Sequence, residues 1–227
     1  MNLALQRARS SWLLAFGDVI TLLLTFFIVV VVMNKSDSNR IEQWVDDQLT
    51  QSYQQLEKSI KSNQLDLIAV KREPRGVLLT IRGAAAFKSG SYEPSARLSQ
   101  QLSLIGELLP NIKVLQLGFS SKINGVVERA LEDGYDWHAE VSVLGHTDND
   151  WVDPESTLRN NFFLSTLRAE QVAIELKAYS NLPAELFSIS GYGQWQPLMS
   201  NDSEQGKAQN RRVEILITAG FKEINNF

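Results

Sequence analysis

The stretch Leu13–Met33, LLAFGDVITLLLTFFIVVVVM, decides how this chain is organised. Its 21 residues are almost all apolar, and Asp18 is the one charged residue among them. A helix of about 20 apolar residues is long enough to cross the hydrocarbon core of a bilayer. We therefore predict one transmembrane helix over residues 12–33, with a carboxyl group inside the membrane.

Asp18 is the first candidate functional residue. A carboxylate at the middle of a membrane helix costs roughly 2.5–3.5 kcal/mol on insertion scales, and a simple anchor gains nothing from that cost. Reversible binding of H+ or Na+ is the chemistry that suits such a group. At 3.6 residues per turn, Thr21 and Thr25 share its helix face and are candidate supporting residues of an ion path. Two alternatives stay open: Asp18 reaches the membrane interface near Trp12, or each threonine hydroxyl bonds a carbonyl of its own helix.

The flanks of the apolar stretch bear on its processing and orientation. The stretch is longer than the ~7–15 apolar residues of a signal peptide, and no small-x-small cleavage motif follows it, so we expect an uncleaved anchor. Basic residues stand on both sides, Arg7 and Arg9 before it and Lys35 and Arg40 after it, which leaves the charge bias nearly balanced. The short N-terminus favours a cytoplasmic leader over residues 1–11 and an exported remainder.

The composition of the 227 residues excludes several classes of function. The net charge of −4 offers no basic surface for nucleic acid, and the absence of cysteine excludes disulfides and thiolate metal sites. The exported part carries two histidines, His138 and His146, without a paired-carboxylate motif or a recognisable Ser-His constellation. We expect no catalytic residue, no metal site and no cofactor, and hence no enzyme.

A second, amphipathic segment follows a polar break at Asn34–Asn39. Its apolar residues recur at i, i+3, i+4 and i+8, which is the spacing of one helix face. They are Ile41, Trp44, Val45 and Leu49. Such a helix either docks on a partner or begins a stalk outside the membrane. Because residues 50–66 are rich in Gln, Ser and Lys, we predict a linker region over residues 34–66.

From about Leu67 the composition becomes globular. Short runs rich in Val, Ile and Leu predict strands, and runs with apolar residues at helical spacing predict helices. The expected strands are Leu67–Val70, Val77–Ile81, Ala139–Leu144, Phe187–Ser190 and Arg212–Thr218. The expected helices are Ser95–Leu109, Val126–Leu131 and Leu164–Tyr179, while Val114–Leu117 fits a strand or a helix end. Together they predict an α+β domain over residues 67–220, with a tail at 221–227.

Four short motifs fall at the ends of these elements. They are Gly145-His146-Thr147-Asp148, Leu164-Ser165-x-x-Arg168-Ala169, Gly191-Tyr192-Gly193 and Asn210-Arg211-Arg212-Val213. In this order they resemble the OmpA-like peptidoglycan-binding domain, a mixed α/β sandwich. Phe87-x-x-Gly90-Ser91 resembles the usual entry to that domain. The long loop Asn149–Asn160 and the spacer Gly118–Asp136 depart from the compact form of the family.

The resemblance implies a site for peptidoglycan. The family holds the free diaminopimelate end of the stem peptide, which offers carboxylates and an ammonium group. The matching positions are Arg168, whose guanidinium suits a carboxylate in a two-point contact, and Asp148, which suits an ammonium. Asn161, Thr147 and Arg211 are further candidate peptidoglycan-binding residues. The open alternatives are that Thr147 shapes its loop and that Arg211 braces the fold.

The N-terminal segment carries a second resemblance. Trp12-x-x-x-Phe16-x-Asp18-x-x-Thr21-x-x-x-x-Phe26-Phe27 is similar to the membrane helix of the B subunit of ion-driven stators of the MotB and PomB type. In that family a plug segment stands between this helix and an OmpA-like domain. The matching plug residues are Ile41, Trp44, Val45 and Leu49. The resemblance implies a homodimer in the bacterial inner membrane with its C-terminal domain in the periplasm, a multi-helix A subunit as partner, and Asp18 as carrier of H+ or Na+.

The function expected from both halves is torque generation by a wall-anchored stator subunit, most simply in a flagellar motor. Two other roles stay open: the B subunit of a Zorya-type anti-phage defence motor, which shares this layout, and a passive tether between inner membrane and cell wall. The tether predicts that Asp18 is replaceable without loss. The choice between H+ and Na+ also stays open, because a proton needs only the carboxyl group, whereas hydroxyls such as those of Thr21 and Thr25 also suit Na+.

Overall fold

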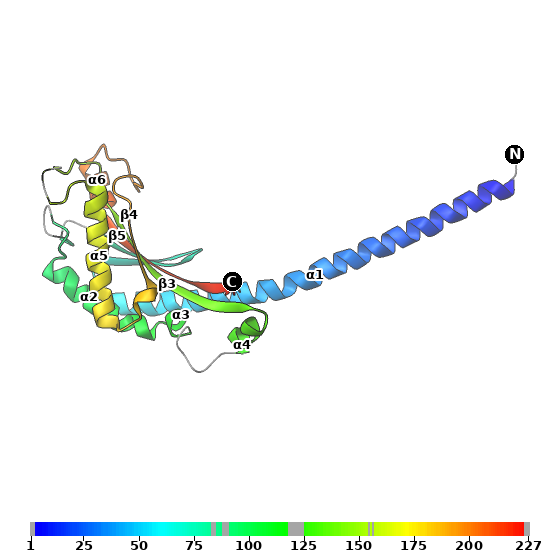
Figure 1. Ribbon diagram of the computed structural model, residues 1–227, viewed down its shortest axis with the longest axis horizontal. Helices are drawn as coiled ribbons and strands as arrows, with labels where there is room; N and C mark the ends of the chain where they lie inside the picture. Colours follow the sequence, from blue (N-terminus) through cyan, green and yellow to red (C-terminus); the bar gives the residue numbers. More distant parts are fainter. Residues whose placement is uncertain are drawn as a thin grey trace. The chain divides into compact units, whose positions relative to one another are not determined.

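The computed structural model describes residues 3–82, 85–87, 91–117, 125–153, 155 and 157–224. The chain divides into two compact units, Met1–Trp44 and Val45–Phe227. Helix α1 (Leu3–Ser62) contributes residues to both, and the five strands that the structure describes belong to the second unit (Figure 1). The second unit is therefore a mixed α/β domain, as the sequence predicted.

The first unit is the membrane-length part of α1. Residues Trp12–Val31 form a 20-residue apolar segment that is long enough to cross a bilayer. The side chains of this segment are exposed, and no other described part of the chain covers them. An apolar helix surface of this length needs lipid or other helices around it. The segment thus has the length and the apolar surface of the predicted transmembrane helix.

Helix α1 does not stop at Asn34–Asn39, where the sequence predicts a break. Residues such as Asn, Ser and Asp lower helix propensity by at most about 0.7 kcal/mol each. Neither Gly nor Pro occurs between Met33 and Ser62 to end the helix. The predicted break was wrong because it rested on polarity alone. The amphipathic segment and most of the linker are consequently parts of one helix.

The C-terminal part of α1 packs within the second unit. Leu49 is 3% exposed and Leu56 is 1% exposed, so this part of the helix turns an apolar face inward. Gln55 Nε2 donates a hydrogen bond to Asn111 O at 3.0 Å, which fixes the helix against the rest of the unit. The residues from 50 onward that the sequence favours as a linker are therefore largely a docked helix.

The second unit is built on a five-stranded sheet with the strand order β1-β2-β5-β3-β4. Its strands are β1 (Ile68–Glu73), β2 (Gly76–Arg82), β3 (Tyr135–His146), β4 (Phe187–Gly191) and β5 (Arg212–Glu223). Neighbouring strands are antiparallel except β3 and β4, which run parallel and are joined through α5 (Asn161–Ser180). A parallel pair needs such a crossover. The carboxyl ends of β3 and β4 and the N-terminus of α5 consequently lie at one end of the sheet.

The core lies between one face of this sheet and two helices, α2 (Ala96–Leu108) and α5, which pack side by side (Figure 1). Cross-strand neighbours on that face form rows of fully buried residues, for example Val77, Ile217 and Val141. Burying each such side chain contributes about 1.5–3 kcal/mol. The alternation of apolar residues along β2, β5 and β3 is thus what joins the sheet to the helices.

The predicted strands and long helices are confirmed, with shifts at their ends. The remaining helical elements are η1 (Leu109–Asn111), α3 (Lys113–Gln116), α4 (Gly125–Glu132), η2 (Ala184–Leu186) and α6 (Glu204–Asn210). The segment Val114–Leu117, which fits a strand or a helix end by sequence, mostly forms α3. Helix α6 is an element that the sequence pattern did not predict. Within the predicted spacer, residues 118–124 lie outside the described residues.

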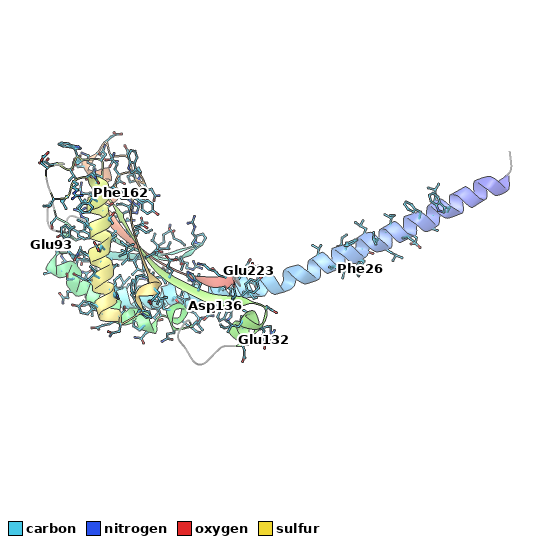
Figure 2. All side chains as sticks on the ribbon, viewed as in Figure 1. Phe26, Glu93, Glu132, Asp136, Phe162 and Glu223 are labelled. Carbon is cyan, nitrogen blue, oxygen red and sulfur yellow. The ribbon has the colours of Figure 1, made fainter. Side chains whose placement is uncertain are left out.

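Strands β3 and β5 are longer than predicted and pair along their whole length, beginning with Tyr135 opposite Glu223 (Figure 2). Trp137 and Phe221 face each other in this ladder, with ring centroids 5.1 Å apart. An aromatic cross-strand pair of this kind stabilises a two-stranded extension. Strand β5 therefore continues past residue 220, where the sequence predicts the end of the domain.

The place where β3 meets α5 has no room for a side chain. A Cβ atom added to Gly145 would lie 1.9 Å from Ser165 O, a backbone atom of α5. We expect Gly145→Ala to lower the free energy of unfolding of the full-length chain by about 2–3 kcal/mol or more, since the backbone has to move to admit the methyl group. Urea unfolding followed by tryptophan fluorescence measures this change.

The matched control for this variant is Gly220→Ala, on the neighbouring strand β5, where an added Cβ meets no atom within 4 Å. Its free energy of unfolding should stay within about 0.5 kcal/mol of the wild-type value. An equal loss in both variants would show that the loss comes from the strand backbone and not from the contact with α5.

Candidate functional site

The four sequence motifs meet at the carboxyl end of β3. Thr147 N donates to Gly193 O at 2.9 Å, and Gly193 N donates to Ser165 Oγ at 2.9 Å. The first contact joins the loop after β3 to the loop after β4, and the second joins that loop to α5. An ion pair between Asp148 and Arg211 adds the segment before β5. Candidate residues that are far apart in the chain are thus brought into one site. We call it the wall site, after the ligand that its motifs predict, and it comprises Thr147, Asp148, Asn161, Arg168 and Arg211.

Asp148 is the buried anion of the wall site, with 6% of its surface exposed. Its Oδ2 accepts a hydrogen bond from Arg211 Nη1 at 2.5 Å, and its Oδ1 accepts one from Asp150 N at 3.2 Å. A buried carboxylate is tolerated when it is paired and hydrogen-bonded, and both conditions are met here. Each oxygen keeps a second lone pair, which suits an ammonium or amide donor of a ligand.

Arg168 reaches the same site from α5. Its Nε and Nη2 both donate to Ser91 O, at 3.2 and 3.0 Å, and its guanidinium lies over the ring of Phe87 at 5.1 Å from the centroid. Burial lowers the pKa of Arg168 to about 10, while the charge of Asp148 opposes this shift and that of Arg211 reinforces it. The group remains a cation at neutral pH, and these bonds leave its Nη1 for a ligand.

The charges of the wall site do not balance. Two guanidinium groups, those of Arg168 and Arg211, stand near one carboxylate, that of Asp148. In a partly buried site a surplus cation attracts an anion, and the planar fork of arginine matches a carboxylate. The arrangement therefore suits a ligand that carries a carboxylate.

Asn161 and Thr147 differ in what they leave for a ligand. The amide Nδ2 of Asn161 donates to Asp150 O at 2.8 Å and to Gln194 Oε1 at 3.1 Å, so it braces two loops and only its carbonyl oxygen remains. The hydroxyl of Thr147 is buried and has no hydrogen-bond partner among the described residues. A buried hydroxyl without a partner is unfavourable, but this one has no surface that a ligand could reach without a local movement of the loop.

Next to the wall site, His146 and Arg212 serve the fold. The ring of His146 stacks on Tyr192 with centroids 5.3 Å apart, and neither ring nitrogen has a hydrogen-bond partner within the described part of the chain. Arg212 Nε donates to Glu214 Oε1 at 2.6 Å, and its Nη2 donates to Gln196 O. Burial, aided by the charge of Arg212, lowers the pKa of His146 to about 4 against the opposing charge of Glu214. His146 is therefore neutral at physiological pH.

Two contacts of the wall site were not predicted from the sequence. The carbonyl of Ser91 holds Arg168, although only the resemblance of the Phe87 motif hinted at this segment, and Gly90 of that motif lies outside the described residues. Lys207 Nζ pairs with Asp150 Oδ1 at 2.6 Å. Lys207 stands on α6, a short polar helix, and no periodicity in the sequence signals this contact.

In the first unit, Asp18, Thr21 and Thr25 lie on the exposed surface of α1. Thr21 Oγ1 donates to Asp18 O at 2.8 Å, and Thr25 Oγ1 donates to Thr21 O at 3.0 Å and to Leu22 O at 2.9 Å. Both hydroxyl protons are thus used within the helix, while lone pairs of the hydroxyl oxygens remain. No described residue forms a hydrogen bond or ion pair with the carboxyl group of Asp18.

Two family models match the chain. The model described as "Membrane MotB of proton-channel complex MotA/MotB" matches residues 5–49, and the model of the OmpA family matches residues 86–211. Two proteins of Bacillus subtilis (strain 168) are similar over nearly the full length. The uncharacterized protein YtxE is 26% identical over 93% of this chain and 90% of its own length. Motility protein B is 24% identical over 93% of this chain and 92% of its own length.

Solved structures share the fold of the chain. A MotB-like protein from Desulfovibrio vulgaris has a TM-score of 0.60 at 18% identity, and the match covers 78% of this chain and 94% of that one. The cell wall anchor of the T6SS from Pseudomonas aeruginosa has a TM-score of 0.52 at 30% identity, covering 73% of this chain and 95% of that one. The first likeness concerns the fold alone, whereas the second extends to the sequence.

His146 makes the stability of the domain depend on pH. Below its ordinary pKa of 6.5 the unfolded chain takes up a proton on this ring, whereas the folded chain does so only near pH 4. The unfolded state therefore binds more protons between these values, and stability falls as the pH falls through this window. We expect the wild type to lose about 2–3 kcal/mol between about pH 7.5 and 4.5 through this ring, and His146→Phe to lack that loss.

Urea unfolding of both full-length proteins across this pH range tests the prediction, because the carboxylates are the same in each. Phenylalanine keeps the stacking on Tyr192 and removes the titration. His138→Phe is the control, since the ring of His138 is about half exposed in the folded chain. Parallel losses in the wild type and His146→Phe would mean that the buried ring is not the source.

Proposed function

Because this chain belongs to the OmpA family and is MotB-like in its membrane segment, we propose that it is the wall-anchored B subunit of an ion-driven membrane motor. One observation carries the proposal. The same chain joins an exposed apolar helix bearing Asp18 to a domain whose wall site gathers Arg168 and Arg211 around Asp148. The helix suits ion transfer, and the wall site suits a ligand that stays in place.

The proposed ligand of the wall site is peptidoglycan, through the free end of a stem peptide. Its carboxylate would bind Nη1 of Arg168 and balance the surplus positive charge, and its ammonium would bind the remaining lone pairs of Asp148. Asn161 offers a carbonyl oxygen for a further bond, whereas the buried hydroxyl of Thr147 would join in only after a local movement of its loop. Arg211 holds Asp148 in position through their ion pair.

The proposed ion carrier is Asp18. Binding of H+ or Na+ removes the net charge of the carboxylate, which costs roughly 2.5–3.5 kcal/mol at the centre of a membrane helix and less at Asp18, nearer one end of the span. A change of this size favours one helix packing when the ion is bound and another when it is released, which couples ion flow to movement. The oxygen lone pairs of Thr21 and Thr25 would support Na+, whereas a proton needs only the carboxyl group.

The proposed assembly is a homodimer with a multi-helix A subunit in the bacterial inner membrane. The exposed span of α1 supports it, since a carboxyl group within a membrane needs other helices around it. The N-terminus would lie in the cytoplasm and the domain in the periplasm, where peptidoglycan is. The likeness to motility protein B favours flagellar torque generation, and a Zorya-type defence motor would use the same parts.

The plug is assigned to the first half of the amphipathic segment. Ile41 and Trp44 precede the boundary of the second unit, whereas Val45 and Leu49 lie within that unit. Leu49 is buried there and serves the domain core in this structure. We therefore place the residues that would close the ion path before assembly around Ile41 and Trp44.

A passive tether is the second candidate function. It is favoured by the likeness to the cell wall anchor of the T6SS from Pseudomonas aeruginosa. A tether needs the wall site and a membrane anchor, but it has no use for an ion carrier. The carboxyl group of Asp18 therefore separates the two candidates.

We expect Asp18→Asn to abolish motility and ion leak when the chain is expressed with its A subunit, because an amide cannot release and rebind a proton or balance Na+. Ion leak becomes measurable in a background that lacks residues 41–44, since removing about one helical turn disrupts the plug and nearly keeps the helix register. Cytoplasmic pH and sodium uptake, followed in media with and without sodium, identify the ion.

The matched control for this experiment is Asp47→Asn, which neutralises an exposed carboxylate outside the membrane span. Its ion leak should equal that of the parent protein without this substitution. Membrane insertion and wall binding have to be unchanged in Asp18→Asn, so that its loss is assigned to the carboxyl group. If cells that express Asp18→Asn swim and leak ions as cells with the parent protein do, the motor proposal fails and the passive tether remains.

We expect Arg168→Gln to weaken binding of the full-length chain to purified sacculi at least about tenfold, since a hydrogen bond to a charged group contributes roughly 1.5–3 kcal/mol. Co-sedimentation with sacculi measures this. Arg97→Gln removes a surface guanidinium that pairs with Asp66, and it should bind like the wild type. Unchanged binding by Arg168→Gln would remove Arg168 from the ligand set.

A further inference from the structure

Three large aromatic side chains are exposed beside the wall site. Trp151 is 80% exposed, Trp195 is 77% exposed and Phe162 is 59% exposed. Exposed indole and phenyl rings contribute little to folding, and a group of them on one surface indicates a binding site. Phe162 lies at the start of α5, at the loop end of the domain (Figure 2).

One side chain holds the segments that carry these rings. The amide of Asn161 donates to Asp150 O at 2.8 Å and to Gln194 Oε1 at 3.1 Å. Each of the three aromatic residues directly follows one member of this hydrogen-bonded trio. The backbones also approach closely, since a Cβ on Gly193 would lie 3.2 Å from Phe162 N. The backbone segments that carry the three rings are therefore hydrogen-bonded to one another through Asn161 and do not belong to independent loops.

We propose that Trp151, Phe162 and Trp195, together the aromatic rim, bind the glycan strand of peptidoglycan. The inference rests on the proposed function, in which the neighbouring wall site takes the stem peptide. The β-linked amino sugars of the strand present C–H groups on the faces of their rings, and the electron-rich faces of aromatic rings attract such hydrogens. The rim side chains carry no charge, which matches sugars whose amino groups are acetylated and whose lactyl carboxyl groups are amide-linked to the stem peptide.

Continuity with the wall site selects this occupant. Asn161 also donates to Asp148 O at 3.3 Å, so one side chain braces both the wall site and the segments that carry the rim. Stem peptide and glycan are covalently joined, and a polymer held at Asp148 and Arg168 therefore brings its sugars close to the rim. Two contacts to one polymer reinforce each other through a high effective concentration. Trp151 stands on the long loop Asn149–Asn160, so this contact comes from a segment that compact OmpA-like domains do not have.

The test separates sugar binding from peptide binding. Amidase digestion of sacculi yields two probes, peptide-free glycan strands and free stem peptides, while undigested sacculi carry both. The lactyl carboxyl groups that amidase exposes on the glycan strands are capped as methylamides, so that this probe stays uncharged and offers no carboxylate to Arg168. The full-length chain in detergent is compared with the double variant Trp151→Ala/Trp195→Ala and with Arg168→Gln. Ile174→Ala removes another exposed apolar side chain of α5 and is the matched control. Isothermal titration measures binding of the soluble probes, and co-sedimentation measures binding of the sacculi.

We expect the double variant to bind glycan strands and sacculi at least about fivefold more weakly than the wild type, which is the usual effect of truncating an anchor residue. Its binding of stem peptides should be unchanged. Arg168→Gln should show the reverse pattern, with weaker binding of stem peptides and unchanged binding of glycan strands. Ile174→Ala should bind all three probes like the wild type.

Two results would overturn the inference: a wild-type chain that binds stem peptides but no peptide-free glycan, or glycan binding that the double variant retains. The first result leaves the proposed function intact. Conversely, glycan binding that depends on the tryptophans, in a chain that does not bind stem peptides, supports the aromatic rim and refutes the peptide site. Failure of the rim and failure of the wall site are therefore distinguishable.

Discussion

The close approach of β3 and α5 at Gly145 and Ser165 is the contact on which the wall site depends. Without a side chain on Gly145, the backbone of α5 occupies the space that a Cβ would fill. Ser165 then accepts a hydrogen bond from the loop after β4 and ties that loop to the helix. Asn161 and Arg168 lie about one turn before and one turn after Ser165 on the same side of the helix. One packing contact therefore places an amide and a guanidinium beside the loop that follows β3.

The effect of the charge imbalance in the wall site depends on the burial of its charged side chains. Arg211 neutralises Asp148 through a direct ion pair. Arg168 is held by the carbonyl of Ser91 and the ring of Phe87, which are uncharged groups that orient it without neutralising it. Burial disfavours its charged form, as the lowered pKa of about 10 shows. A carboxylate at its free edge would restore the lost stabilisation, so the anionic ligand that we propose would be favoured by the arrangement of three charges and not by one residue.

Local patterns in the sequence predicted most of the fold. The length of one apolar run was enough for the membrane-length segment, and apolar periodicity was enough for the strands and the long helices, because these depend on which residues face the core. The sequence was misleading at Asn34–Asn39, where polarity alone does not end a helix, and at Leu49, whose burial depends on tertiary contacts. In the wall site the motifs predicted which residues meet but not what each does. Asn161 was expected to bind the ligand, but its amide donates hydrogen bonds to Asp150 and Gln194. Residue type alone does not fix the direction of a side chain.

Asp148 and Asp18 represent two opposite ways to keep a carboxylate away from water. Asp148 is buried and has its counter-charge in the partly exposed Arg211 of the same chain, and this ion pair is present without a ligand. Asp18 has no such partner among the described residues, and the hydroxyl protons of Thr21 and Thr25 are used on helix carbonyls. An unpaired carboxylate in hydrocarbon costs roughly 2.5–3.5 kcal/mol, so other helices or a bound cation have to offset it. In the proposed motor, the wall site would thus hold its ligand steadily, whereas the energy of the Asp18 carboxylate would depend on the cation that binds it, which is the property that an ion-driven motion requires.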